Sequence, residues 1–115
     1  MPKKGQKGEA AAAAFLEDKG IKILEKNFRS RMGEIDIIAL DGETLAFVEV
    51  KNWTSFGIES LEYALDHKKQ HKIVETSKYF LSLHREYRYM AIRFDVIFVS
   101  PRGITHLASA FTESV

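Results

Sequence analysis

The 115-residue chain contains no cysteine, which excludes a disulfide framework, thiolate zinc sites, iron–sulfur clusters and cysteine nucleophiles. It has only two prolines, and no apolar run approaches the roughly 20 residues needed to cross a bilayer. The alanine run Ala10–Ala14 is flanked by acids, unlike the apolar core of a signal peptide with its cleavage site. We therefore expect a cytoplasmic protein with no membrane-spanning segment.

An excess of either charge is also missing, because 17 Lys and Arg face 16 Asp and Glu. A nucleic-acid-binding domain of this size is often clearly basic, so the total argues mildly against such a partner. The basic residues are unevenly placed, however. Residues 66–88 carry six Lys and Arg against three Asp and Glu, and Lys3, Lys4 and Lys7 open the chain. This distribution fits either a phosphate-binding surface or a solvated helix face with i, i+4 ion pairs.

The length and a hydrophobic content of 45% predict a single domain over residues 1–115. We expect residues 1–7, which are basic, and residues 108–115 to be mobile ends. The expected elements are a helix over 9–19, strands over 21–28, 33–40 and 44–51, a helix over 61–83, a strand over 92–99 and an edge strand over 104–107. This order predicts an α/β domain with a mixed central sheet flanked by helices.

The second and third strands are joined by Asp41-Gly42, a dipeptide favoured in two-residue type I′ hairpin turns. With these two residues as the turn, Asp36 lies opposite Phe47, and Glu49 becomes a diagonal neighbour of Asp36, roughly 7–8 Å away. Side chains alternate along a strand. One face of the hairpin should therefore carry Glu34, Asp36, Glu49 and Lys51, and the other Ile35, Ile37, Val48 and Val50.

Two carboxylates on one sheet face repel each other, and a divalent cation would remove that repulsion. Oxygen ligands such as Asp36 and Glu49 suit Mg²⁺ or Mn²⁺. Lys51 on the same side would orient a water or stabilise charge developing on a phosphate. The alternative is that Glu49 and Lys51 form a surface ion pair while Asp36 is a solvated strand residue.

Asp36 followed by Glu49-Val50-Lys51 resembles the acid, acid-x-lysine signature of the PD-(D/E)XK nucleases. A wider set of residues over about 5–100 is similar to the YraN-type family, which is related to the archaeal Holliday-junction resolvases. That set comprises Lys7-Gly8-Glu9, Gly20, Ile23-Leu24, Asn27, residues 33–39, residues 47–51, Phe56-Gly57, Lys69, residues 79–81 and residues 93–96. The resemblance implies the restriction-endonuclease-like fold, whose core of helix, three strands, helix and strand agrees with the pattern above.

The resemblance also implies roles for individual residues. Asp36 and Glu49 would bind Mg²⁺ or Mn²⁺, Lys51 would be the catalytic lysine, and Glu9 would be an acid contributed by the first helix. Glu9 shares a helix face with Ala13 and Leu16, which favours a position against the sheet. The alternative for Glu9 is an acid that stabilises a helix N-terminus through the dipole.

A further group of residues is expected to contact nucleic acid. Arg29 and Arg31 flank the site strand, and Lys72 belongs to the basic helix. Lys69 and Gln70 match the place where related nucleases carry a polar helix residue facing the site; an exposed helix face is the alternative. Trp53 stands where many relatives have an arginine. An aromatic there would stack on a base, or would pack under the loop.

Four histidines invite a metal site, because His67 and His71 stand at i, i+4. No H-E-x-x-H pattern or third ligand accompanies them, so we expect His67, His71, His84 and His106 to be solvated. We expect Asp95 to make a structural hydrogen bond rather than to bind metal, and Glu34 to be solvated.

These observations predict a metal-dependent endonuclease that hydrolyses phosphodiester bonds, with DNA, including branched DNA, as the expected substrate. The resolvase resemblance adds the expectation of a homodimer. One alternative is a nucleic-acid-binding module that keeps the fold but has little or no catalytic activity. Another is a protein-interaction domain in which the acids are structural.

Overall fold

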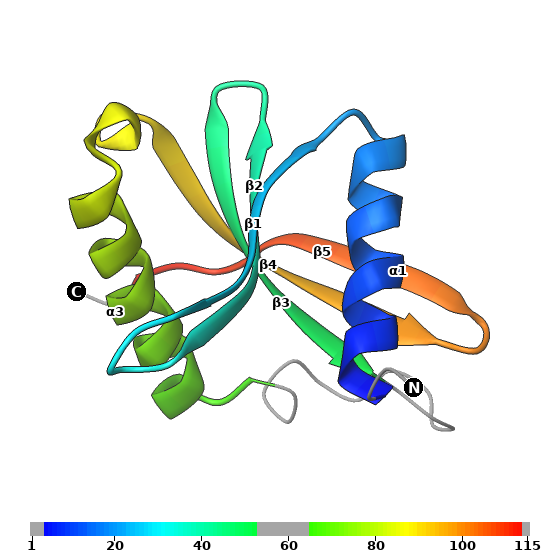
Figure 1. Ribbon diagram of the computed structural model, residues 1–115. Helices are drawn as coiled ribbons and strands as arrows, with labels where there is room; N and C mark the ends of the chain where they lie inside the picture. Colours follow the sequence, from blue (N-terminus) through cyan, green and yellow to red (C-terminus); the bar gives the residue numbers. More distant parts are fainter. Residues whose placement is uncertain (1–3, 53–64, 114–115) are drawn as a thin grey trace.

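The computed structural model describes residues 4–52 and 65–113. In this part of the chain, a five-stranded sheet lies between two α-helices, α1 (Lys4–Asp18) and α3 (His67–Leu83) (Figure 1). The strands are β1 (Lys22–Arg29), β2 (Glu34–Asp41), β3 (Thr44–Asn52), β4 (Ala91–Ser100) and β5 (Gly103–Phe111). They lie side by side in sequence order, and only β3 and β4 are parallel. This mixed sheet confirms the α/β, restriction-endonuclease-like fold.

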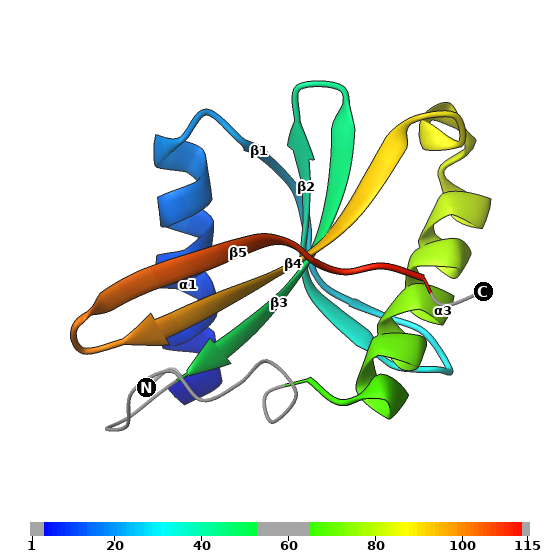
Figure 2. The ribbon, with the colours of Figure 1, turned by 180° about the vertical axis from the view of Figure 1, so that it is seen from behind.

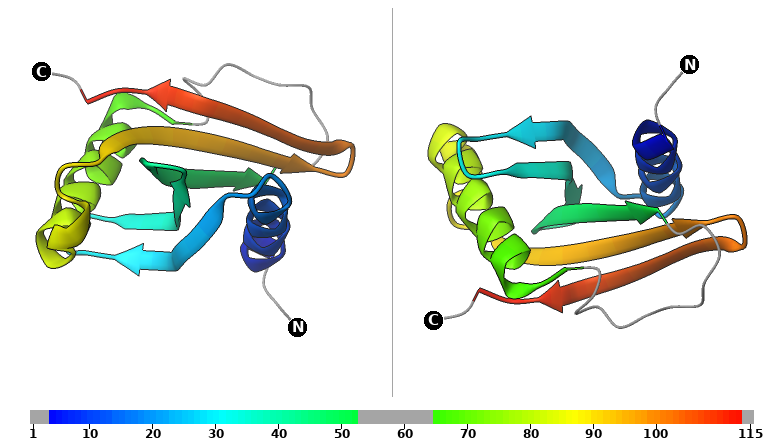
Figure 3. Two further views of the ribbon diagram at one scale, coloured as in Figure 1. Left: turned by 90° about the horizontal axis from the view of Figure 1, so that it is seen from above. Right: turned by 90° about the horizontal axis from the view of Figure 1, so that it is seen from below.

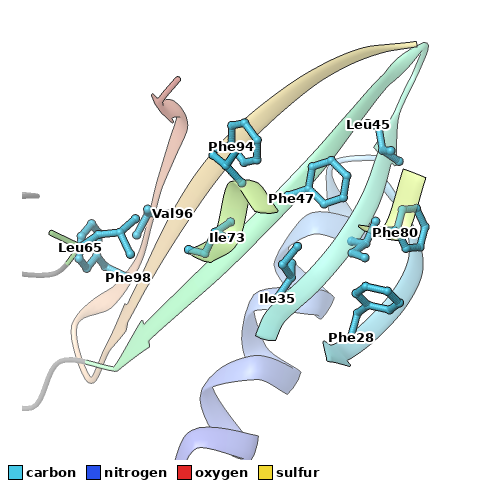
Figure 4. Packing of buried hydrophobic residues seen from close by; sticks show 12 residues of the cluster. Phe28, Ile35, Leu45, Phe47, Leu65, Ile73, Phe80, Phe94, Val96 and Phe98 are labelled. Atoms are coloured by element: carbon cyan, nitrogen blue, oxygen red, sulfur yellow. The ribbon is translucent and has the colours of Figure 1, made fainter. Parts of the chain in front are cut away.

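The two helices cover opposite faces of the sheet, as the reverse view also shows (Figure 2). On the α1 face, small residues such as Ala12 and Ala13 let the helix lie close to Ile37 and Val48. On the α3 face the core is aromatic (Figure 4). The Phe80 ring of α3 meets those of Phe28 and Phe47 edge-on, with ring centroids 5.2 and 5.9 Å apart. Burying each such ring stabilises the fold by ~1.5–3 kcal/mol, so these contacts fix α3 on the sheet.

Several element boundaries differ from the sequence-based expectation. The second long helix begins at His67 rather than Leu61, because the Asp66 side chain caps it by accepting a hydrogen bond from the Lys69 backbone N–H at 2.9 Å. The expected helix residues 61–64 lie outside the described part. The last strand, expected over 104–107, runs over Gly103–Phe111 and so includes part of the segment 108–115. A short 3₁₀ helix, Arg85–Tyr87, was not expected. No helix among the described residues is long and apolar enough to span a membrane.

The register of the β2–β3 hairpin corrects the predicted one. The pairs run from Asp41–Thr44 to Ile37–Val48, so Gly42 and Glu43 form the turn instead of Asp41 and Gly42. Gly42 alone has a left-handed φ of 60°, which is the glycine placement of a type II′ turn. Phe47 therefore lies opposite Ile38, not opposite Asp36. Because the register shifts by two residues, each β3 side chain stays on the predicted face of the sheet. Glu49, however, moves from a diagonal position towards a place directly across from Asp36.

The alternation of side chains also breaks near Asp36. Ile37, Val48 and Val50 face α1, as expected for one hairpin face, but Ile35 packs in the core beneath α3 together with Ile38. Residues three apart cannot share a face in a regular strand, so β2 is twisted between them. The same region of β1 is bent, as the end-on views show (Figure 3). The expectation for Ile35 was wrong because it assumed an unbroken strand.

Candidate active site

The β2 and β3 strands part from each other at Asp36 and Glu49. Their pairing stops at Ile37–Val48, although β2 begins at Glu34 and β3 continues to Asn52. Beyond this point β2 stays paired with β1, and β3 stays paired with β4. The sheet thus forks: the β1–β2 end runs towards α3 and the β3 end towards the start of α1 (Figure 1). We call this opening the fork.

Asp36 bridges the fork with its side chain. Its Oδ2 accepts a hydrogen bond from the Val50 backbone N–H at 2.8 Å, which replaces a lost ladder bond. The carboxyl group of Asp36 also contacts that of Glu49. Burial, and then the hydrogen bond and negative charge of Glu49, raise the pKa of Asp36 to about 8.

Lys51 lies beside this pair. Its Nζ is 3.4 Å from Oε2 of Glu49, and both side chains are largely withdrawn from solvent, with 21% and 15% exposed. This exposure contradicts the alternative of a surface ion pair. Asp36 is itself half-buried, so it is not a solvated strand residue.

Glu9 reaches the fork from the first described turns of α1. Partial burial, and then the negative charge of Asp36, raise the pKa of Glu9, whereas a hydrogen bond from the Asn27 side chain lowers it. The carboxyl group therefore faces the sheet and not only the helix N-terminus. Asn27 belongs to β1, so α1, β1, β2 and β3 all contribute side chains here.

Lys69 of α3 approaches the fork from the opposite side. Its ammonium contacts Lys51, and this contact, followed by partial burial, lowers the pKa of Lys69. Glu49 and Asp66 act in the other direction because their negative charges favour the ammonium form. The structure thus brings Glu9, Asp36, Glu49, Lys51 and Lys69 together from separate parts of the chain.

The donor chemistry of Asp36 and Glu49 fits Mg²⁺ or Mn²⁺, because two carboxyl groups in contact offer hard oxygen ligands and a divalent cation removes their mutual repulsion. No group of three or more His, Asp or Glu side chains within residues 4–52 and 65–113 is placed to hold a metal ion. Mg²⁺ is often held by one or two carboxylates, with waters and substrate phosphate oxygens completing its shell. The pair is sufficient for that manner of binding.

A basic rim borders the fork where the β1–β2 hairpin packs on α3. Ser30 and Thr76 join the two by a hydroxyl–hydroxyl hydrogen bond of 3.0 Å. Gly33 lies so close to α3 that a Cβ there would be 3.3 Å from Cβ of Lys72. We define the basic rim as Arg29, Arg31 and Lys72, all of which are exposed. Arg29 also pairs with Glu34 at 3.7 Å.

Comparison with known proteins places this chain in a family. Residues 8–99 match Uncharacterised protein family UPF0102. The chain belongs to this family. It is 44% identical over 108 residues to a UPF0102 protein of Persephonella marina, covering 94% of this chain and 92% of that protein. A UPF0102 protein of Treponema denticola is 44% identical over 125 residues, with 96% of each chain covered. These matches confirm the YraN-type resemblance, and with it the relation to PD-(D/E)XK nucleases.

For two residues that were expected to bind nucleic acid, Gln70 and Trp53, the described part of this UPF0102 protein shows no contact with the fork. The Gln70 side-chain amide donates a hydrogen bond to the backbone oxygen of Leu65 at 3.0 Å, so it braces the segment before α3. Trp53 lies outside the described residues.

The histidine expectation is wrong for two of the four residues. His106, 5% exposed, shares a hydrogen bond of 2.8 Å with the buried carboxylate of Asp95. His84 stacks on Phe80, with ring centroids 4.2 Å apart. Both were expected to be solvated because the sequence does not reveal the strand and the ring that cover them. His67 and His71 are exposed, and Asp95 makes the structural hydrogen bonds expected of it.

Sequence reasoning on this UPF0102 chain gave no role to Asn27, which contacts Glu9. Its backbone has a left-handed φ of 54° within β1. Two signals were available: Asn27 belongs to the residues that carry the family resemblance, and it is an asparagine inside a strand pattern, where this residue tolerates a left-handed conformation better than most.

Proposed function

We propose that this protein is a Mg²⁺- or Mn²⁺-dependent nuclease that hydrolyses phosphodiester bonds of nucleic acid, with DNA as its substrate. The observation that carries the proposal is the convergence of two carboxylates and two lysines in the fork. Membership of the family supports it, because the matched residues 8–99 include every member of this cluster. Two half-buried carboxyl groups in contact are unfavourable unless a positive charge lies between or beside them.

Each residue of the fork has a separate role in the proposed reaction. Asp36 and Glu49 would hold the metal, with Asp36 fixed by the Val50 N–H, which engages Oδ2. When bound, the cation supplies Lewis-acid neutralisation of the phosphate and lowers the pKa of a water. Lys51, kept in place by Glu49, donates a hydrogen bond to a phosphate oxygen or orients the attacking water. Glu9 and Lys69 complete the site from the two helices.

The basic rim would hold the nucleic-acid backbone on the α3 side of the fork. Its arginines and lysine are exposed and can therefore reach phosphates, Arg29 by exchanging its ion pair with Glu34. Such contacts bind any sequence, so the proposal implies little base specificity from this surface.

Cleavage assays test the enzymatic proposal. Duplex, single-stranded and branched DNA are incubated with the protein and Mg²⁺ or Mn²⁺. We expect Asp36→Asn, Glu49→Gln and Lys51→Met each to lower the rate at least about 100-fold. Glu43→Gln is the matched control, because Glu43 is an exposed carboxylate at the far turn of the same hairpin. Absence of cleavage by the wild type, or variants as active as the control, would contradict the proposal.

Thermal unfolding tests metal binding separately. Mn²⁺ should raise the Tm of the wild type, because a ligand that binds only the folded state stabilises it, and EDTA should reverse the shift. The double variant Asp36→Asn/Glu49→Gln should show no such shift. An equal shift in the double variant would place the metal elsewhere.

One observation favours a second candidate, a nucleic-acid-binding module of this fold with little or no activity: no third ligand side chain accompanies the pair within the described residues. Such a module would bind DNA with a steep salt dependence and would ignore divalent metal. Mn²⁺-independent binding together with absent cleavage would select this candidate.

A further inference from the structure

Asn27 occupies a strained position opposite the site. Its neighbours Lys26 and Phe28 pair with Ile37 and Ile35, which puts Asn27 across from Asp36 on the adjacent strand. It is one of only two non-glycine residues with a left-handed φ in the described part of the chain. The left-handed conformation costs an L-residue ~1–2 kcal/mol, although asparagine is among the residues that tolerate it best.

At Asn27, the side chains of the β1–β2 pair change from packing on the α1 face of the sheet to packing on the α3 face. Before it, Lys26 pairs with Ile37, whose side chain lies on the α1 face. After it, Phe28 and Ile35 both pack beneath α3. The turn coincides with the point at which β2 leaves β3, so Asn27 lies at the base of the fork.

The side chain of Asn27 hydrogen-bonds the Glu9 carboxylate. A second contact brings the same turn of α1 to the other arm of the fork. A Cβ on Gly8 would be 2.1 Å from Oδ1 of Asn52, the last residue of β3, so a larger residue at this position would displace the Asn52 side chain. Asn27 from β1 and Asn52 from β3 thus lie next to neighbouring residues of α1, Glu9 and Gly8.

We propose that Asn27 is a positioning residue whose left-handed backbone and side-chain amide hold the Glu9 carboxylate against Asp36. This inference rests on the proposed function, since it assigns Glu9 a part in the metal-dependent reaction. Asn27 touches neither the Asp36–Glu49 pair nor Lys51 in any contact that the structure records, so it acts through Glu9. Outer-shell partners of this kind commonly account for ~10–100-fold in metal affinity or activity.

The first test compares glycine substitutions at the two left-handed positions. Asn27→Gly keeps the backbone conformation, because glycine is unstrained there, but removes the amide. Ser109→Gly is the matched control: Ser109 has a φ of 53° in β5, and only its backbone N–H, which glycine retains, bonds to Asp95. We expect Asn27→Gly to lower Mn²⁺ affinity and kcat about 10-fold with KM nearly unchanged. Ser109→Gly should leave all three at wild-type values.

The second test is a double-mutant cycle with Glu9→Gln, measured by Mn²⁺ affinity and by kcat. If Asn27 acts through Glu9, adding Asn27→Gly to Glu9→Gln causes no further loss. Additive losses, or wild-type Mn²⁺ affinity in Asn27→Gly, would overturn the inference. A wild type that binds Mn²⁺ and follows the cycle but cleaves nothing would contradict the nuclease proposal and leave the positioning role standing.

Discussion

Asp36 and Asp95 are both withdrawn from solvent, yet their pKa values move in opposite directions. For each, burial raises the pKa, and hydrogen bonds then decide the outcome. Asp36 meets another carboxyl group, Glu49, and its pKa rises further. Asp95 accepts hydrogen bonds from His106, the Ser109 backbone N–H and Arg93, which together bring its pKa below the usual range. Surplus donors make Asp95 a structural group, whereas the contact between the carboxyl groups of Asp36 and Glu49 is the basis of the proposed cation site.

Asp95 should control the acid stability of the fold. Because its pKa is lowered by folding, its contribution to stability is present above the unfolded pKa of about 3.9 and is lost as the pH falls through the folded value. Asp95→Asn should therefore destabilise the protein by ~3 kcal/mol at pH 7, by leaving buried donors unmatched. The difference from wild type should shrink below about pH 4. Urea unfolding across this pH range measures both effects.

Asp41 supplies the control for this prediction. It pairs with Arg93 Nη1 at 2.8 Å, but its side chain is 42% exposed. Asp41→Asn should cost much less than Asp95→Asn, because water replaces an exposed partner. Equal losses in the two variants would refute a special role for the buried carboxylate.

At the scale of elements, the β2–β3 hairpin decides where the site forms. The sequence predicts both strands and the face shared by Asp36 and Glu49, because side-chain alternation depends only on local geometry. It does not distinguish Asp41-Gly42 from Gly42-Glu43 as the turn, since both place glycine where a two-residue loop accepts it. Cross-strand packing and the fork settle the register, and these contacts are remote in sequence.

Substitutions at the turn glycine, Gly42, should lower the stability of the fold without changing metal binding. Gly42 has a φ of 60°, and a Cβ there would meet nothing within 4 Å, so alanine introduces backbone strain but no clash. Gly42→Ala should lower the unfolding free energy by ~1–2 kcal/mol, and Gly42→Asn by less. Metal binding should not change in either, because the turn is at the end of the hairpin away from the fork. A loss of Mn²⁺ affinity at constant fold would contradict this separation.

For the whole molecule, near-neutral net charge conceals a separation of charges. Three carboxyl groups, those of Glu9, Asp36 and Glu49, meet in the fork, whereas the basic rim lies beside it on the β1–β2 hairpin and α3. The total of +1 therefore gives no guidance about the partner. Local potential, and not the sum, governs the encounter with a polyanion.

The salt dependence of DNA binding tests this arrangement. In an Asp36→Asn background, which should prevent cleavage, Arg31→Ala and Lys72→Ala should each reduce the slope of log K against log salt by about 1. Arg85→Ala, an exposed arginine beyond the far end of α3, should leave the slope unchanged. Fluorescence anisotropy with a labelled duplex measures the slope. Equal changes in slope at Arg31, Lys72 and Arg85 would indicate that DNA is attracted by the overall positive charge and not by the basic rim.

The sequence by itself determined the order of elements, the core faces of most strands, the acid and acid-x-lysine pattern and the family, since each depends on residue types at short spacing. Only the tertiary structure decided that β2 and β3 part at Asp36, that α1 delivers Glu9 and α3 delivers Lys69, and that Asn27 adopts a left-handed conformation. These features arise from long-range packing. Separate cores hold the two helices on opposite faces of the sheet, and both helices reach the same fork. This convergence depends on contacts between residues distant in sequence, so no local sequence pattern predicts it.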